Sequence, residues 1–123
     1  MTTAMLQNAS GAFVAPTAQT FAAAAAGADW SKAPGFYLLL LNQPGAEAWP
    51  ITGATFILVH RRQTDAASGK AILAFFDGAY RDGDAQAQAL DYVPLPAEVK
   101  ALARKSWAGV VGPDGLPVYT PAP

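Results

Sequence analysis

The sequence contains no cysteine and only one histidine, His60. The absence of cysteine excludes disulfide scaffolds, thiol nucleophiles and metal sites built on thiolates. A single histidine also excludes histidine-rich metal sites, and a catalytic triad would have to use His60 as its base. We therefore expect neither a metal nor a cofactor, and no enzyme activity.

A strong net charge and a long apolar run are missing as well. Eight basic and nine acidic residues leave a formal net charge of −1, so we expect no nucleic-acid partner and no polybasic membrane patch. No apolar run approaches the roughly 18 residues of a bilayer-spanning helix, so direct membrane insertion is not expected. The N-terminus lacks the pattern of a secretory signal. The sequence therefore predicts either a protein that stays inside the cell or a mature or internal piece of a precursor.

The chain is nevertheless rich in hydrophobic side chains that can pack into a core. Hydrophobic residues make up 52% of the 123 residues and charged residues only 14%. A chain of this length buries roughly 65–70% of its unfolded surface, which is enough for one core. Composition therefore favours an ordered fold over disorder.

Three elements stand out in the first half. Thr17 is a candidate N-cap for a helix over residues 18–26, with Gly27 as its stop. Residues 36–41 form a short apolar run, and its periodicity does not distinguish a strand from a helical turn. Residues 51–60 predict a strand with apolar side chains on both faces, which is typical of the middle of a sheet covered on both sides.

The second half predicts three helices, over residues 70–81, 84–90 and 96–107, and an extended tail with a turn at Pro113-Asp114-Gly115. The loop before them covers residues 63–69. The expected buried residues are Ile72, Leu73, Phe76, Ala79 and Tyr80 in the first helix, and Val99, Leu102, Ala103 and Trp107 in the last, with Lys100, Arg104 and Lys105 outward. The predicted fold is α/β: one central buried strand covered by helices, in a sheet that a single chain leaves incomplete.

Several polar groups are candidate sites. His60-Arg61-Arg62 ends the predicted strand, and these side chains could bind an anion there. Charged residues at a strand end are more often simply exposed to solvent. Thr52 and Thr55, which flank Gly53, offer hydroxyls to an anion, although such residues also favour strands. Asp82-Gly83-Asp84 lacks the later residues of a calcium loop and is expected to be a turn. The acidic residues expected to be solvated are Asp77, Asp82, Asp84 and Asp91.

Four blocks of the sequence are distinctive: residues 27–32 (GADWSK), 48–58 (AWPITGATFIL), 75–80 (FFDGAY) and 90–96 (LDYVPLP). Through these blocks, residues 21–116 resemble a known family, the C-terminal part of the periplasmic phosphate-binding proteins that feed bacterial ABC phosphate transporters. Trp107 and the closing residues 114–119 fit the end of that family.

The resemblance implies a partial type II binding-protein fold of two lobes. Residues 1–50, with the helix at 18–26, correspond to the end of the second lobe, and residues 51–123 to the C-terminal segment of the first. The family's phosphate-contacting motifs lie upstream of the matched region. Thr52 and Thr55 are therefore at best hinge or cleft-lining residues, and the sheet partners of residues 51–60 belong to earlier sequence.

We therefore expect a phosphate-binding-protein-like chain of an ABC uptake system, in a truncated or split form that lacks the phosphate ligands. The alternative is a truncated paralogue that acts as an interaction module by self-association or by binding another protein. The implied partners are a transporter permease, phosphate once the fold is completed, and either a second copy or a complementing chain. The resemblance implies that the protein is located in the periplasm. Because the sequence shows no secretory signal pattern, a cytoplasmic location is the alternative.

Overall fold

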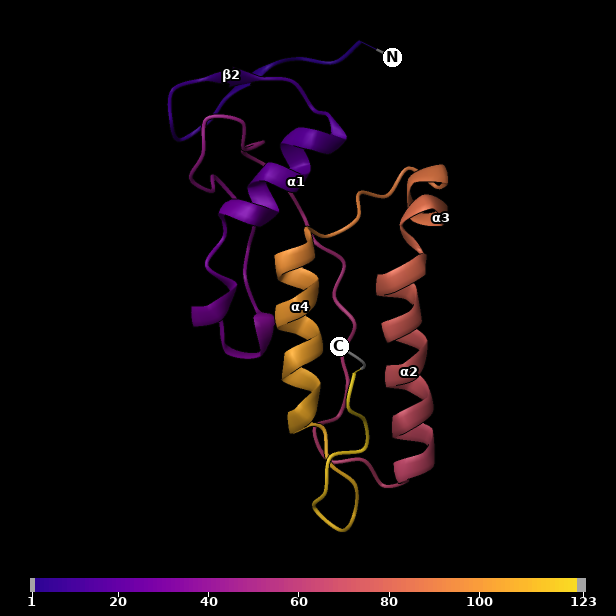
Figure 1. The fold of residues 1–123 in the computed structure, drawn as a ribbon. Helices are drawn as coiled ribbons and strands as arrows, with labels where there is room; N and C mark the ends of the chain where they lie inside the picture. Colours follow the sequence, from indigo (N-terminus) through magenta and orange to yellow (C-terminus); the bar gives the residue numbers. More distant parts are fainter. Residues whose placement is uncertain (1, 122–123) are drawn as a thin grey trace.

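A computed structural model describes residues 2–121. Figure 1 shows a small α/β arrangement, with a short β hairpin and α1 in one half and three helices in the other. Among these residues, no helix combines the length and apolarity that a membrane crossing requires. The elements are β1 (Leu6–Gln7), β2 (Phe13–Val14), α1 (Ala18–Gly27), α2 (Ala66–Asp82), α3 (Asp84–Ala89) and α4 (Ala97–Ser106), with single 3-10 turns η1 (Trp30–Lys32), η2 (Pro34–Phe36) and η3 (Trp107–Gly109).

The hairpin is fastened to the loop at residues 45–48 by one buried side chain. Leu6 of β1 pairs with Val14 of β2 in antiparallel register. Asn8, which is 6% exposed, follows β1, and its Nδ2 atom donates to the carbonyls of Gly45, Ala46 and Ala48. The amide thus connects segments about 40 residues apart in the chain.

Helix α1 confirms the predicted Thr17 cap. The Thr17 side chain accepts a hydrogen bond from the backbone N–H of Thr20, and the Thr20 side chain accepts one from the backbone of Thr17. The helix includes Gly27, and Ala28 is its C-cap. A Cβ on Gly27 would stand 2.4 Å from the carbonyl oxygen of Pro44, so only glycine lets these backbones approach.

The predicted buried strand at residues 51–60 is wrong for this chain. Ile51 forms an isolated bridge with Leu41, but residues 52–60 make no backbone–backbone hydrogen bond within the described part of the chain. Phe56, Ile57 and Leu58 are 44%, 59% and 96% exposed. Strand propensity needs paired neighbours, and the described residues supply none along this stretch. We call residues 52–60 the extended segment.

Helix α2 begins four residues earlier than the sequence predicted. Asp65 caps it, because its carboxylate accepts hydrogen bonds from the N–H groups of Ala67 and Ser68. The expected loop over residues 63–69 is therefore wrong from Ala66 onward. Leu73 is fully buried, while Ile72 is 44% exposed, so the predicted apolar face of this helix is only partly confirmed.

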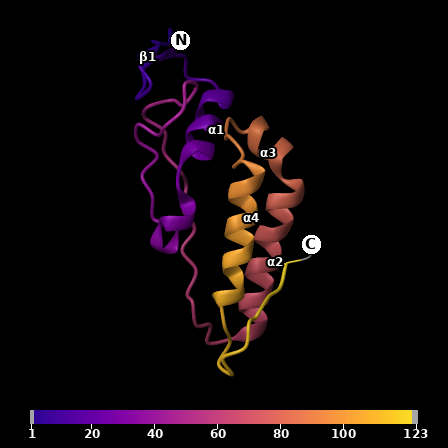
Figure 2. The ribbon, with the colours of Figure 1, turned by 60° about the vertical axis from the view of Figure 1, so that its left-hand side comes forward.

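Helices α3 and α4 form close to where they were predicted. Lys100 of α4 reaches back to the carbonyl oxygen of Tyr80 at 3.0 Å and to Oδ2 of Asp84 at 2.6 Å. Lys100 is therefore half-buried rather than outward. Val99 is buried as predicted, but Leu102 is 37% exposed. Figures 1 and 2 both show α2 and α4 side by side.

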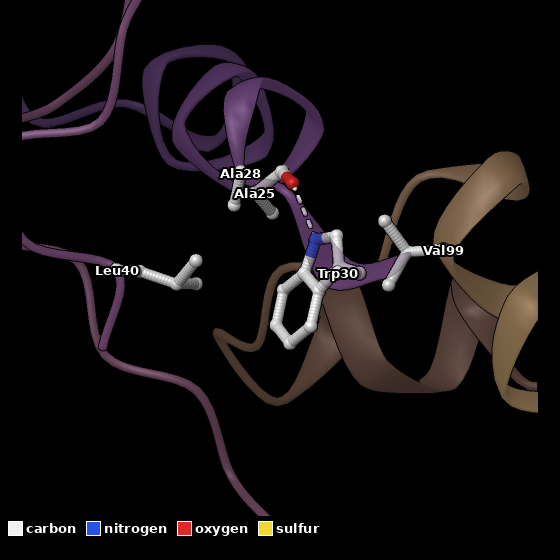
Figure 3. Close-up of a cluster of buried hydrophobic side chains, with 5 residues drawn as sticks. All are labelled: Ala25, Ala28, Trp30, Leu40 and Val99. Atoms are coloured by element: carbon white, nitrogen blue, oxygen red, sulfur yellow. Dashed lines mark hydrogen bonds between the residues drawn. The ribbon is translucent and has the colours of Figure 1, made fainter. Parts of the chain in front are cut away.

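The main hydrophobic cluster joins α1 to α4. Figure 3 shows the indole N–H of Trp30 bonded to the Ala25 carbonyl at 2.7 Å, with Leu40 and Val99 on either side of the ring. Trp30 thereby satisfies its polar atom while its ring fills the space between the two helices. Ala28 completes the cluster of five buried residues.

The tail confirms the predicted turn and forms a small extended layer. Gly115 has φ +80°, a left-handed conformation that favours glycine. The turn lets Val111 pair with Pro117 on one side, and on the other side Val111 pairs in parallel with Arg62. The tail therefore covers the chain at residues 61–63 and leaves the extended segment uncovered.

Candidate functional site

An open groove of about 1260 Å³ lies between the extended segment and the helices. In Figure 2 the ribbon of the extended segment runs apart from those of α2 and α4. Side chains of the extended segment and of the helices line the groove. Most of these lining side chains are apolar. They include Phe21 and Ala25 of α1, Leu73, Phe76 and Tyr80 of α2, and Val99 and Ala103 of α4.

Both predicted site residues, Thr52 and Thr55, line this groove. The Thr52 hydroxyl donates to the carbonyl of Trp49 at 3.2 Å, which fixes the start of the extended segment. Thr55 is exposed. The structure brings the two residues to one surface, and their place in a ligand cleft stays a prediction.

Two oppositely charged residues belong to the groove lining, Arg61 and Asp91. Arg61 and Arg62 also line a second hollow of about 380 Å³ beside Gly109 and Val111. Both arginines are exposed, and among residues 2–121 neither guanidinium forms an ion pair or a hydrogen bond. The backbone there is fixed, since Val111 N–H donates to Arg61 and Gln63 N–H donates to Val111. The predicted cationic group therefore sits at one end of the groove.

Asp77 is the polar residue that sequence reasoning misplaced. It was expected on a solvated helix face, but it is only 3% exposed. Its Oδ1 accepts from Arg104 Nε at 2.6 Å, and its Oδ2 accepts from the Tyr119 hydroxyl at 2.8 Å. The Arg104 guanidinium holds the pKa of the Asp77 carboxyl below its ordinary value, against the opposing effect of burial. Arg104 is therefore not outward as predicted.

A sequence signal for Asp77 did exist. Asp77 stands four residues after Leu73, which places the carboxylate on the buried stripe of α2. Tyr80, three residues further on, stacks on Trp107 with ring centroids 5.9 Å apart. An acidic residue on such a stripe needs a cationic partner, and α4 provides Arg104. This cluster joins α2, α4 and the tail.

The described residues offer few places for an anion or a metal. At the N-terminus of α1 the Thr17 side chain accepts from the N–H of Thr20, and at that of α2 the Asp65 carboxylate accepts from two N–H groups, whereas α4 has no side-chain cap. In the described chain no three His, Cys, Asp or Glu residues are grouped as metal ligands would be. Asp82 pairs with Arg81 and Asp84 with Lys100, so the Asp82-Gly83-Asp84 group is a turn between helices. The polar groups of the described residues mainly satisfy one another.

Comparison with known proteins places the chain beside one set of relatives. No family model matches it. Over 103 residues it is 48% identical to the phosphate-binding protein PstS of Xylella fastidiosa strain 9a5c, covering 84% of this chain and 28% of the relative. Identity is 45% over 104 residues with PstS of Pasteurella multocida, and 42% over 102 residues with PstS of Haemophilus influenzae. Each of these two matches covers 30% of the relative, so the chain spans less than a third of the length of these proteins. The resemblance that the sequence blocks indicated is confirmed.

Proposed function

The chain is homologous to part of the phosphate-binding protein PstS, and on this premise we propose that it serves as a phosphate-binding component of an ABC phosphate uptake system. The observation that carries the proposal is 42–48% identity over 83–85% of the chain to three proteins of that name. The proposed partners are phosphate and a transporter permease, and the proposed compartment is the periplasm. The chain is proposed to bind its solute without transforming it.

We further propose that the phosphate ligands lie outside these 123 residues. The apolar groove supports this, because an oxyanion needs several N–H or hydroxyl donors around it. The occupied N-termini of α1 and α2 support it as well. Thr52 and Thr55 would then line the cleft near a crossing between lobes, with residues 1–50 in the second lobe and residues 51–123 in the first.

A chimera tests the first part of the proposal. In the Xylella fastidiosa relative, the matched 103 residues are replaced by the corresponding residues of this chain, and phosphate binding is measured by calorimetry. We expect binding comparable to that of the parent relative. A chimera that folds, as judged by circular dichroism, but does not bind phosphate would contradict the proposal.

The isolated chain tests the second part. Titration of the 123-residue protein with inorganic phosphate is expected to give no saturable heat, with the parent relative as the positive control. In the chimera, Thr52→Val and Thr55→Val report whether either hydroxyl touches the ligand. Saturable phosphate binding by the isolated chain would place the ligands inside it and refute this part.

A further inference from the structure

The C-terminal tail contributes two of the three pieces of a small extended layer. Residues 110–112 form the middle piece, and Val111 bonds through its N–H and C=O groups to residues 61–63. Its neighbours on either side bond to residues 116–119, which we call the terminal arm. Because successive residues of an extended chain point to opposite edges, the arm and residues 61–63 lie on opposite sides of the middle piece. The arm is therefore an outer edge, and its departure would leave the other pairing in place.

Few backbone bonds hold the terminal arm. Val118 N–H donates to the Val110 carbonyl at 3.0 Å, and Gly112 N–H donates to the Leu116 carbonyl at 2.9 Å. Among residues 2–121, no backbone–backbone hydrogen bond joins the arm to α2 or α4. Residues 113–117, which are the turn and the start of the arm, are exposed. Segments with few buried contacts and solvent-exposed backbone bonds are those that open locally in a folded protein.

The Tyr119 side chain fastens the terminal arm to helix α2. Its hydroxyl donates to Oδ2 of Asp77 at 2.8 Å. The Asp77 residue is 3% exposed, and its Oδ1 already accepts from Arg104. The Tyr119 ring also lies near Trp107, with ring centroids 6.2 Å apart. Tyr119 thus supplies the donor that the second oxygen of a buried carboxylate requires.

We propose that the terminal arm is a latch, which opens and closes while α2 and α4 stay folded, with the Tyr119–Asp77 hydrogen bond as its clasp. In the closed state Tyr119 keeps water away from the Asp77–Arg104 pair, and opposite charges attract more strongly where water is excluded. In the open state water replaces Tyr119 as the donor to Asp77, and the Tyr119 ring leaves Trp107. The latch involves no phosphate, so its failure leaves the chimera experiment unaffected, and the reverse also holds.

Residue-resolved hydrogen–deuterium exchange of the full chain, measured by NMR at increasing urea concentration, tests the latch. The amides of Gly112 and Val118 are expected to exchange through one shared opening that depends weakly on urea, because that opening exposes little surface. The central amides of α2 and α4 should exchange more slowly and depend steeply on urea. Equal rates and equal urea dependence in the arm and the helices would overturn the proposal, since the arm would then open only when the whole chain unfolds.

A pair of tyrosine variants tests the clasp. Tyr119→Phe keeps the ring near Trp107 but removes the donor to Asp77, and we expect exchange at Gly112 and Val118 to become about tenfold faster. Tyr92→Phe is the matched control without effect, because Tyr92 is 63% exposed and its hydroxyl forms no hydrogen bond within the described chain. If Tyr119→Phe accelerates exchange in the arm no more than Tyr92→Phe does, the assignment of the clasp is wrong.

A core variant shows whether the arm opens independently of the helices. Leu73 is fully buried, and its loss in Leu73→Ala weakens the folded chain equally with the arm closed or open. Exchange should therefore become faster at the central amides of α2 and α4 but stay unchanged at Gly112 and Val118. Acceleration of both sets by the same factor would overturn the latch.

The charge of the clasp is tested in the Asp77→Asn background. A hydrogen bond to a neutral amide oxygen is weaker than one to a carboxylate, so Tyr119→Phe should now accelerate exchange at Val118 by only about threefold. Circular dichroism checks that the helices remain folded in this background. A tenfold acceleration in both backgrounds would show that the carboxylate is not the acceptor that closes the latch. If Asp77→Asn does not fold, the Tyr119→Phe and Leu73→Ala results decide.

Discussion

The Nε atom of Arg104 lies 2.6 Å from Oδ1 of Asp77, which joins α4 to α2 through a carboxylate that is 3% exposed. Replacement of Asp77 by Asn leaves Arg104 without this counter-charge. We expect Asp77→Asn to lower the free energy of unfolding by about 2–4 kcal/mol, because the buried position loses the charge that strengthens its hydrogen bonds to Arg104 and Tyr119. Urea unfolding followed by circular dichroism measures the change. Asp82→Asn breaks an exposed pair with Arg81 and serves as the control without measurable effect. Equal effects of the two changes would show that burial of Asp77 contributes nothing.

The same pair predicts how stability depends on acid. The pKa of Asp77 is lowered in the folded chain, so its contribution is complete above the unfolded value of about 4 and is lost as the pH falls through the folded value. Asp29, Asp65 and Asp82 also have lowered pKa values, so the wild type alone cannot isolate Asp77. The gap in stability between wild type and Asp77→Asn should therefore narrow as the pH is lowered through this window. A constant gap in urea titrations from neutral to strongly acidic pH would argue against the ion pair.

The core of the helical half depends on Leu73, whose side chain is fully buried. Leu73→Ala is expected to lower the free energy of unfolding by about 2–5 kcal/mol, because a cavity remains after the side chain is lost. Leu116→Ala is the matched control, since Leu116 is 64% exposed. Urea unfolding of both variants measures the difference, and a loss of similar size at Leu116 would contradict the assignment of the core.

Two glycines in helices are expected to respond to alanine in opposite directions. A Cβ on Gly78 of α2 meets nothing within 4 Å, so Gly78→Ala should stabilise the chain by about 0.5–1 kcal/mol through helix propensity. A Cβ on Gly27 of α1 would stand 2.4 Å from the Pro44 carbonyl, so Gly27→Ala should destabilise it. Thermal unfolding of the two variants reports both signs. Stabilisation by both changes would mean that α1 and the Pro44 loop move apart at little cost.

Helices were predictable from the sequence where local chemistry decides them. Thr17 predicts the start of α1, because its hydroxyl accepts a hydrogen bond from a backbone N–H within the first turn of the helix. The start of α2 was missed because Asp65 was counted as part of a polar loop rather than as a cap. In both cases the deciding interactions lie within three residues of the cap. Sequence therefore predicts the presence of helices better than their first residue.

Residues 51–60 and Asp77 depend on contacts that are distant in the chain. Strand propensity at Phe56 or Ile57 describes what these residues form when neighbours are present, and no local pattern tells whether the neighbours exist. Asp77 is buried because Arg104 and Tyr119, 27 and 42 residues away, converge on it. Thr52 and Thr55 both line the groove, and their role as hinge or cleft-lining residues stays a prediction. Whether the two hydroxyls contact a ligand depends on which other residues line the same surface.

The three tryptophans divide the molecule into regions that can be observed separately. Trp49 packs edge-on against Phe21 of α1, Trp30 lies in the cluster that joins α1 to α4, and Trp107 stacks on Tyr80 of α2. A set of variants that each retain one indole would give fluorescence from one region at a time. Coincident transitions would show that the junction at Trp30 makes the two halves unfold as a single cooperative unit.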